Sequence, residues 1–233
     1  MLGGGITGAL MAWHLAEVGI DTLLLERRDI AMGSTAASTA LLQYEVDTHL
    51  CDLIEMVGKP AAERSYLLCL EAIGKLESLT QRLPGDCGFA RKSSLYLASR
   101  RSDVKRLQNE HAARRAIGID VDLLGSDEID AEMSFGAPAA LLSAVGAQVD
   151  PYRLTHLLLA DAARMGVRIH DRTEAVSFVK EDNCLRVQTD RGATVHARRI
   201  VFATGYESQA YLKHKVARFN STYALISEPL DAF

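Results

Sequence analysis

The hydrophobic pattern at the start of the chain predicts a helix followed by a buried strand. Apolar residues recur at helical spacing from Ile6 to Trp13, which predicts a helix over 6–18. The unbroken apolar run 21–26 closes on Glu26 and is typical of a parallel strand that is buried on both faces. The order of glycine-rich turn, helix and strand therefore indicates a βαβ unit whose first strand is reduced to two residues.

The middle of the chain predicts helices that alternate with short strands. Helical periodicity and capping residues predict helices over 47–57, 60–82, 101–117, 126–133 and 150–166, with one short helix near 35–41. Alternation of apolar and polar residues predicts strands over 89–99, 121–125 and 167–170, and extended pieces broken by Gly146 over 138–150.

The last third of the chain predicts antiparallel strands. The pattern over 175–205 predicts a three-stranded meander whose turns are the sequences EDN and DRG, and it ends in a buried strand at 200–205. A further strand is predicted to begin within 221–230.

Composition and charge exclude several classes of protein. The net charge of −4 argues against a nucleic-acid partner, which would need a basic face, and no apolar run is long enough for a membrane span. The four cysteines are isolated in the sequence, which predicts reduced thiols and a cytoplasmic location. The histidines are scattered, so each is expected on the surface or on a helix face, and no spacing indicates a metal site.

A glycine motif at the start of the chain indicates a dinucleotide site. The spacing Gly3-x-Gly5-x-x-Gly8 allows a tight turn, a close approach of the backbone to a diphosphate, and close packing of the helix. Glu26 follows 21 residues after Gly5, where a carboxylate can accept hydrogen bonds from the ribose hydroxyls. This carboxylate argues against NADP, although the two arginines after it weaken that argument. The residues do not distinguish FAD from NAD, because both carry the same ADP half.

Three longer stretches carry a family resemblance. GGGITGALMAWHLAEVG, LLLERRDIAMGSTAAST and RIVFATGYES together resemble the FAD-dependent oxidoreductases of the D-amino-acid oxidase, glycine oxidase and sarcosine oxidase superfamily, from residue 3 to about 230. The resemblance implies FAD as the cofactor and hydride transfer to flavin from a C–H beside an amine nitrogen. The implied substrate is a small-molecule amine or amino acid.

The resemblance also implies a fold class and a domain division. The expected fold is α/β, with a Rossmann-like FAD-binding domain that contains a parallel sheet and a β-meander, plus part of a mixed-sheet substrate domain. We expect residues 1–45 and 150–210 to form the FAD-binding domain. Residues 46–149 and 211–233 are expected to form a helical segment and the partial substrate domain.

The resemblance assigns cofactor contacts residue by residue. They are Gly3, Gly5, Ile6, Thr7 and Gly8 at the pyrophosphate turn, Glu26 and Arg27 at the ribose and adenine edge, Ser34, Thr35, Ala36 and Ser38 beside the pyrophosphate and flavin, Val176 facing adenine, and Ala203, Thr204 and Gly205 at a turn beside the FAD. Hydride transfer from a neutral amine needs no strong protein base, so no catalytic residue is assigned.

Substrate contacts are expected on the sheet that would cover the flavin. Arg91 and Tyr96 lie on strand-like segments, and Tyr223 lies in a later one. An arginine suits a substrate carboxylate because its guanidinium can donate two parallel hydrogen bonds. The segment 41–50 holds no arginine, so amine and amino-acid substrates both remain open.

Two departures from the family pattern keep alternatives open. The strand before the glycines is short, and family chains continue well past Phe233 with a segment that returns to the flavin. We expect an incomplete front portion of such an enzyme, which a partner chain could complete. The alternatives are a non-catalytic FAD-binding subunit or degenerate remnant and, ranked lower, an NAD-dependent dehydrogenase, which would need more α/β repeats after residue 47.

We predict that the isolated chain is poorly stable and retains FAD weakly. A shortened central strand leaves backbone groups of its neighbours unpaired, at about 1–3 kcal/mol for each buried group. The ratio of flavin absorbance at about 450 nm to protein absorbance after purification measures retention. A monomer purified with stoichiometric flavin would contradict this prediction.

Overall fold

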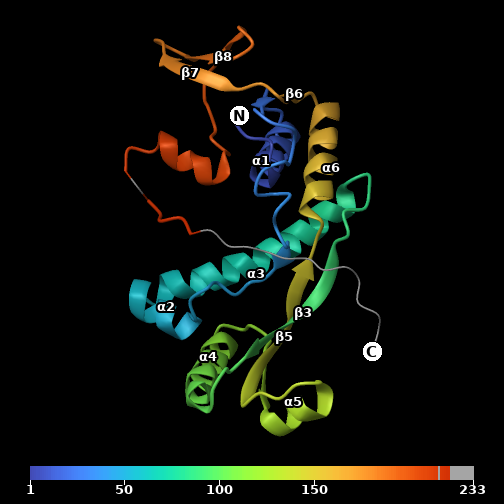
Figure 1. Ribbon diagram of the computed structural model, residues 1–233, viewed down its shortest axis with the longest axis vertical. Coiled ribbons are helices and arrows are strands. Elements are labelled where there is room, and N and C mark those ends of the chain that lie inside the picture. Colours follow the sequence, from blue (N-terminus) through green and yellow to red (C-terminus); the bar gives the residue numbers. More distant parts are fainter. Residues whose placement is uncertain (215, 221–233) are drawn as a thin grey trace.

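The computed structural model describes residues 1–214 and 216–220 (Figure 1). Its helices are α1 Ile6–Glu17, α2 Leu50–Val57, α3 Lys59–Arg82, α4 Val104–Ala116, α5 Ser126–Glu132 and α6 Pro151–Arg164, with 3₁₀ turns at Arg101–Asp103 and Gly205–Tyr211. Its strands are β1 Leu23–Leu25, β2 Leu41–Leu42, β3 Ala90–Leu97, β4 Asp122–Gly125, β5 Ala139–Gln148, β6 Arg168–His170, β7 Ala175–Lys180, β8 Leu185–Thr189 and β9 Thr194–Ala197. Within these residues, no helix is long and apolar enough to cross a membrane.

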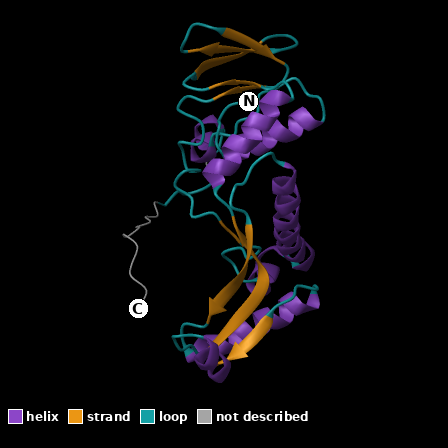
Figure 2. Cartoon of the chain, turned by 90° about the vertical axis from the view of Figure 1, so that its right-hand side faces the viewer, coloured by secondary structure: helices purple, strands orange, loops and turns teal. Residues whose placement is uncertain are grey.

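The elements gather at two ends of an elongated molecule. Helices α1 and α6 lie side by side next to the parallel strands and the β7–β9 meander (Figures 1 and 2). The β3–β5 sheet lies at the other end with α4 and α5, and the long helix α3 crosses between the two ends (Figure 1). Segments far apart in the sequence, α1 and α6, thus form one helical layer.

A parallel layer forms around the first residues of the chain. Strands β1 and β6 pair in parallel, with Leu23 opposite Arg168. Leu2 forms parallel bridges to Leu25 and to Phe202, so one residue takes the central position between two neighbours. The predicted strand at 200–205 is therefore wrong in extent, because only Phe202 pairs.

Helix α1 packs on α6 through its small residues. Ala9 and Ala12 are fully buried, and their short side chains let the two helices approach closely. Trp13 is buried in the same cluster, and its indole Nε1 donates a hydrogen bond to Asp161 Oδ2 at 2.8 Å. This packing fixes the direction in which the start of α1 points.

Strand β5 is the centre of the antiparallel sheet. It pairs with β3 along one edge, and with β4 and β2 at opposite ends of the other edge. The prediction that Gly146 breaks this segment is wrong, since β5 runs continuously through it. A Cβ on Gly146 would lie 2.7 Å from the Lys92 carbonyl oxygen, so glycine allows close pairing at the register shift in β3.

The segment between β1 and β2 differs from its prediction. No helix forms near 35–41; the chain makes turns and then enters β2 at Leu41. Ala31 and Ala40 have φ of +63° and +51°, which a right-handed helix does not allow. The strand predicted within 221–230 lies outside the described residues.

The remaining predictions agree with the structure. The helices predicted over 6–18, 60–82, 101–117 and 150–166 form as α1, α3, α4 and α6. The meander is confirmed as β7–β8–β9, and its two turns close at the predicted sequences.

A buried ion pair ties α4 to the segment that leads into α2. Glu110 is fully buried and accepts hydrogen bonds from Arg114 Nε at 2.7 Å, Leu50 N at 2.8 Å and Cys51 N at 3.0 Å. Burial by itself would raise the pKa of Glu110, but these hydrogen bonds and the guanidinium hold that pKa below its usual value. Arg114, 1% exposed, also donates to Tyr44 Oη at 3.1 Å.

We predict that Arg114→Leu lowers the free energy of unfolding by about 3–5 kcal/mol, because it leaves the Glu110 carboxylate buried without its cation. Urea denaturation followed by circular dichroism measures the change. The matched control is Arg115→Leu, which removes an exposed ion pair with Asp120 and costs less than about 1 kcal/mol. Equal losses for the two variants would contradict the prediction.

Candidate functional site

The glycine turn packs closely between the start of α1 and the Ala203 segment. Gly3 has φ of +105°, and a Cβ there would lie 2.4 Å from the Ala203 carbonyl oxygen. A Cβ on Gly8 would lie 1.9 Å from the Gly3 carbonyl oxygen. The turn is held further by a hydrogen bond from Ala203 N to Leu2 O at 2.8 Å. Any side chain at these two glycines would therefore push the turn out of place.

The first turn of α1 can receive an anion. Its N-cap residue, Gly5, supplies no side-chain hydrogen bond. Ile6 N donates to Thr35 Oγ1 at 3.0 Å, which places the buried Thr35 against the start of the helix. Backbone N–H groups and the helix dipole at such a terminus favour phosphate groups.

Glu26 lies at the end of β1 beside the glycine turn. Its Oε2 accepts a hydrogen bond from Gly4 N at 2.7 Å, and its Oε1 accepts one from Arg28 N at 2.8 Å. Each carboxylate oxygen has a second lone pair, so both can still accept hydrogen bonds from a ligand. The arrangement suits two neighbouring hydroxyl groups.

The other predicted cofactor residues have varied positions. Arg27 makes an ion pair with Glu207, and Thr204 Oγ1 shares a hydrogen bond of 3.0 Å with Ser208 Oγ. Val176 lies on β7 and is 55% exposed. Ile6 and Thr7 begin α1, and Gly205 begins the second 3₁₀ turn. The remaining predicted residues lie in the segment between β1 and β2: Ser34, Ala36 and Ser38.

A cavity of about 480 Å³ lies where the segment after the Thr35 turn crosses the antiparallel sheet. Its lining includes Leu41, Gln43, Glu45, Asp47 and His49 from that segment, Lys92, Ser94 and Tyr96 from β3, Gly146 and Ala147 from β5, and Arg114 from α4. Of the predicted substrate residues, Tyr96 lines the cavity and packs edge-on against His49 with ring centroids 5.1 Å apart. Arg91 is bonded to Glu77 of α3, and Tyr223 lies outside the described residues.

Two polar residues of the cavity wall lack part of their hydrogen bonding: His49 is buried, and the Glu45 side chain is 13% exposed. Glu45 Oε1 accepts hydrogen bonds from Ser94 Oγ at 2.8 Å and from Arg114 Nη1 at 3.3 Å. Glu45 Oε2 and His49 Nδ1 are buried without a partner. Burial lowers the pKa of His49, so its imidazole is neutral near pH 7.

Sequence reasoning missed both of these residues. His49 was expected on a surface or helix face, but it is 9% exposed at the start of α2. A usable signal was present, because Gln43, Glu45, Asp47 and His49 alternate along the segment. Side chains at every second position of an extended chain share one face. That face lines the cavity.

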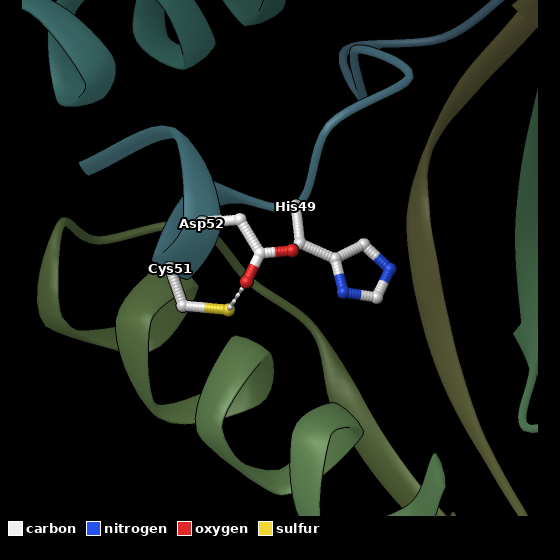
Figure 3. Close-up of side chains that lie close together, drawn as sticks. All are labelled: His49, Cys51 and Asp52. Carbon is white, nitrogen blue, oxygen red and sulfur yellow. Dashed lines mark hydrogen bonds between the residues drawn. The ribbon is translucent and has the colours of Figure 1, made fainter. Parts of the chain in front are cut away.

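His49 also lies near Cys51 and Asp52 (Figure 3). The ring extends from the chain toward the strands of the sheet (Figure 3), and one of its nitrogens lies within 4.8 Å of both the Cys51 Sγ and an Asp52 carboxylate oxygen. Asp52 is paired with Arg106, and burial with the nearby Glu110 raises the pKa of the Cys51 thiol to about 12. The Cys51 thiol is therefore protonated near pH 7, and the Asp52 carboxylate is paired, while His49 also lines the cavity.

Comparisons with known proteins place these features in a family. A family model described as FAD dependent oxidoreductase (DAO) matches residues 2–232. The Bacillus subtilis protein YhfW, which carries the name of a Rieske 2Fe-2S iron-sulfur protein, is 27% identical over 180 residues, 77% of this chain and 35% of that one. Gamma-glutamylputrescine oxidoreductase of Escherichia coli K12 is 26% identical over 219 residues, 93% of this chain and 50% of that one.

The solved structure of glycine oxidase from Geobacillus kaustophilus shares the fold. It matches with a TM-score of 0.76 and 21% identity over 89% of this chain and 55% of that one. The chain therefore spans about half or less of the length of these proteins. Its parallel and antiparallel sheets form the mixed α/β fold of FAD-dependent oxidases. Because the family model matches almost every residue, the chain belongs to the DAO family of FAD-dependent oxidoreductases.

Proposed function

We propose that this chain binds FAD and takes part in oxidising an amine or amino acid at a C–H bond beside its nitrogen. The observation that carries the proposal is the Glu26 carboxylate, which accepts the Gly4 N–H at 2.7 Å at the glycine turn. This hydrogen bond puts an acceptor for ribose hydroxyls beside the start of α1, which suits a diphosphate. The positions proposed for the ribose and for the diphosphate of the ADP half are thus adjacent.

The residues present fit FAD. The first turn of α1 has no side-chain cap from its N-cap residue, and Gly5 leaves only Thr35 Oγ1 near the position that a Cβ would take. The glycine turn and Thr35 would hold the diphosphate, and Glu26 would hold the ribose. A carboxylate in this position also disfavours a 2′-phosphate through charge repulsion.

The chain contributes binding and orientation to the proposed reaction. Bound FAD would supply the redox chemistry, taking a hydride from the substrate C–H. The cavity begins at Leu41, six residues after Thr35 along the chain, and we infer that it receives the substrate. Among the predicted substrate residues, Tyr96 has a position that supports a substrate role, because it lines this cavity. Substrate roles for Arg91 and Tyr223 remain sequence predictions.

The domain division, a partner chain and a cytoplasmic location also remain proposals. The paired helices α1 and α6 with the parallel strands support a cofactor domain assembled from both ends of the sequence. The cysteines Cys51, Cys69, Cys87 and Cys184 are free thiols, which supports a reducing compartment.

We predict that Glu26→Gln weakens FAD binding at least tenfold, because one carboxylate oxygen becomes an N–H₂ group that cannot accept the Gly4 or ribose hydrogen bond. Titration of flavin-free protein with FAD, followed by the change in flavin fluorescence, measures the affinity. Glu17→Gln is the matched control, since Glu17 lies at the far end of α1 in an exposed pair with Arg82. Unchanged FAD affinity in Glu26→Gln would remove the support for the site.

A second prediction concerns the reaction. Anaerobic protein reconstituted with FAD should lose flavin absorbance at about 450 nm when mixed with small amines or amino acids, because hydride transfer reduces the flavin. Spectra recorded against a matched panel of alcohols and hydroxy acids serve as the control. Bleaching by the hydroxy compounds alone would overturn the assignment to amine oxidation.

A further inference from the structure

The cavity holds two buried polar atoms that have no hydrogen-bond partner. They are Glu45 Oε2 and His49 Nδ1, and both residues line the same cavity of about 480 Å³. More than nine-tenths of buried polar groups in proteins are hydrogen-bonded, so an exception needs an explanation. Two exceptions in one cavity point to a ligand that offers hydrogen-bond donors to both.

The charges of Glu45, Glu110 and Arg114 beside the cavity do not cancel. Glu45 and Glu110 share the single guanidinium of Arg114, which lies 2.7 Å from Glu110 and 3.3 Å from Glu45. Arg114 Nε and the backbone N–H groups of Leu50 and Cys51 already satisfy Glu110. Glu45 therefore has the longer contact and a free oxygen, and the two carboxylates have one more negative charge than Arg114 compensates.

The charges at the rim do not change this balance. Asp47 and Lys92 are exposed members of the lining and have opposite signs. Exposed charges are also screened by water and salt, whereas buried ones are screened much less. The field inside the cavity is thus set by Glu45, and it attracts a cation.

The second free atom and its neighbour suit the same ligand. Burial lowers the pKa of His49, and the nitrogen of a neutral imidazole can accept a hydrogen bond from an ammonium group. The Tyr96 ring packs edge-on against His49 and forms part of the same wall. Aromatic faces attract cations through their quadrupole.

We propose that this cavity binds a protonated amine, with the ammonium donating to Glu45 Oε2 and His49 Nδ1. The inference rests on the proposed function and deepens it: the substrate carries a cationic nitrogen in addition to the amine that is oxidised. Hydride transfer needs a neutral amine, whereas pairing with the Glu45 carboxylate keeps an ammonium protonated, so we take the ammonium at Glu45 to be a second nitrogen. The substrate class is therefore a diamine or a longer polyamine.

Isothermal titration calorimetry of the wild-type protein with three probes tests the charge recognition. 1,4-Diaminobutane is the cationic probe, 1,4-butanediol is its neutral analogue of the same length, and glycine is a zwitterion whose carboxylate is repelled by Glu45. We expect the diamine to bind at least tenfold more tightly than the diol or glycine. Equal affinity for diamine and diol overturns the proposal without any variant having to fold.

Two matched variants test the assigned atom. Glu45→Gln removes the charge with little change of shape, and we expect it to weaken diamine binding at least tenfold, or about 1.4 kcal/mol. Glu55→Gln makes the same chemical change at an exposed residue of α2 outside the cavity, and should bind like the wild type. Circular dichroism confirms the fold of each variant. Wild-type affinity in a folded Glu45→Gln protein overturns the proposal.

This inference and the proposed function fail in different ways. Calorimetry detects the amine without any flavin chemistry. Glu45-dependent diamine binding with no flavin reduction by any amine would support the cavity and overturn the proposed oxidation. Flavin reduction by monoamines and diamines alike, unaffected by Glu45→Gln, would support the oxidation and overturn the diamine site.

Discussion

The ion pair between Glu110 and Arg114 is the constraint on which the cavity in this molecule depends. It places a carboxylate under the backbone of Leu50 and Cys51, which fixes where α2 begins. The guanidinium then reaches Tyr44 and Glu45 on the extended segment before that helix. Removing one member of such a pair leaves the other charge buried without a partner. The segment of Tyr44 and Glu45, which forms part of the cavity wall, therefore depends on both Glu110 and Arg114.

The region around the glycine turn depends on the close approach of three backbone segments. Gly3 and Gly8 bring the glycine turn, the start of α1 and the Ala203 segment together, where no Cβ would fit. Leu2 bridges Leu25 and Phe202, so a single residue joins the first and last parts of the parallel layer. The position of Glu26 follows from this arrangement, since it ends the strand beside the turn and hydrogen-bonds to the Gly4 N–H.

One of the stretches of chain that connect the glycine turn with the cavity runs from Thr35 to His49. Thr35 contacts the start of α1, and the segment from Leu41 to His49 then crosses the antiparallel sheet and lines the cavity. A ligand at the glycine turn and a ligand in the cavity would thus contact the two ends of the same short segment. The segment beside the glycine turn thus continues into the wall of the cavity, where Glu45 Oε2 has no hydrogen-bond partner.

The sequence by itself determined the elements whose signals are local. Helical spacing, capping residues and the glycine motif were enough for α1, α3, α4, α6, the meander and the acid at Glu26, because each depends on near neighbours. Tertiary structure alone decided that Gly146 lies within a strand, where it faces the Lys92 carbonyl. It likewise decided that the 35–41 segment forms turns and not a helix. It also decided the cavity. Glu45, His49 and Arg114 meet through burial and pairing across about 70 residues of sequence, which no local pattern encodes.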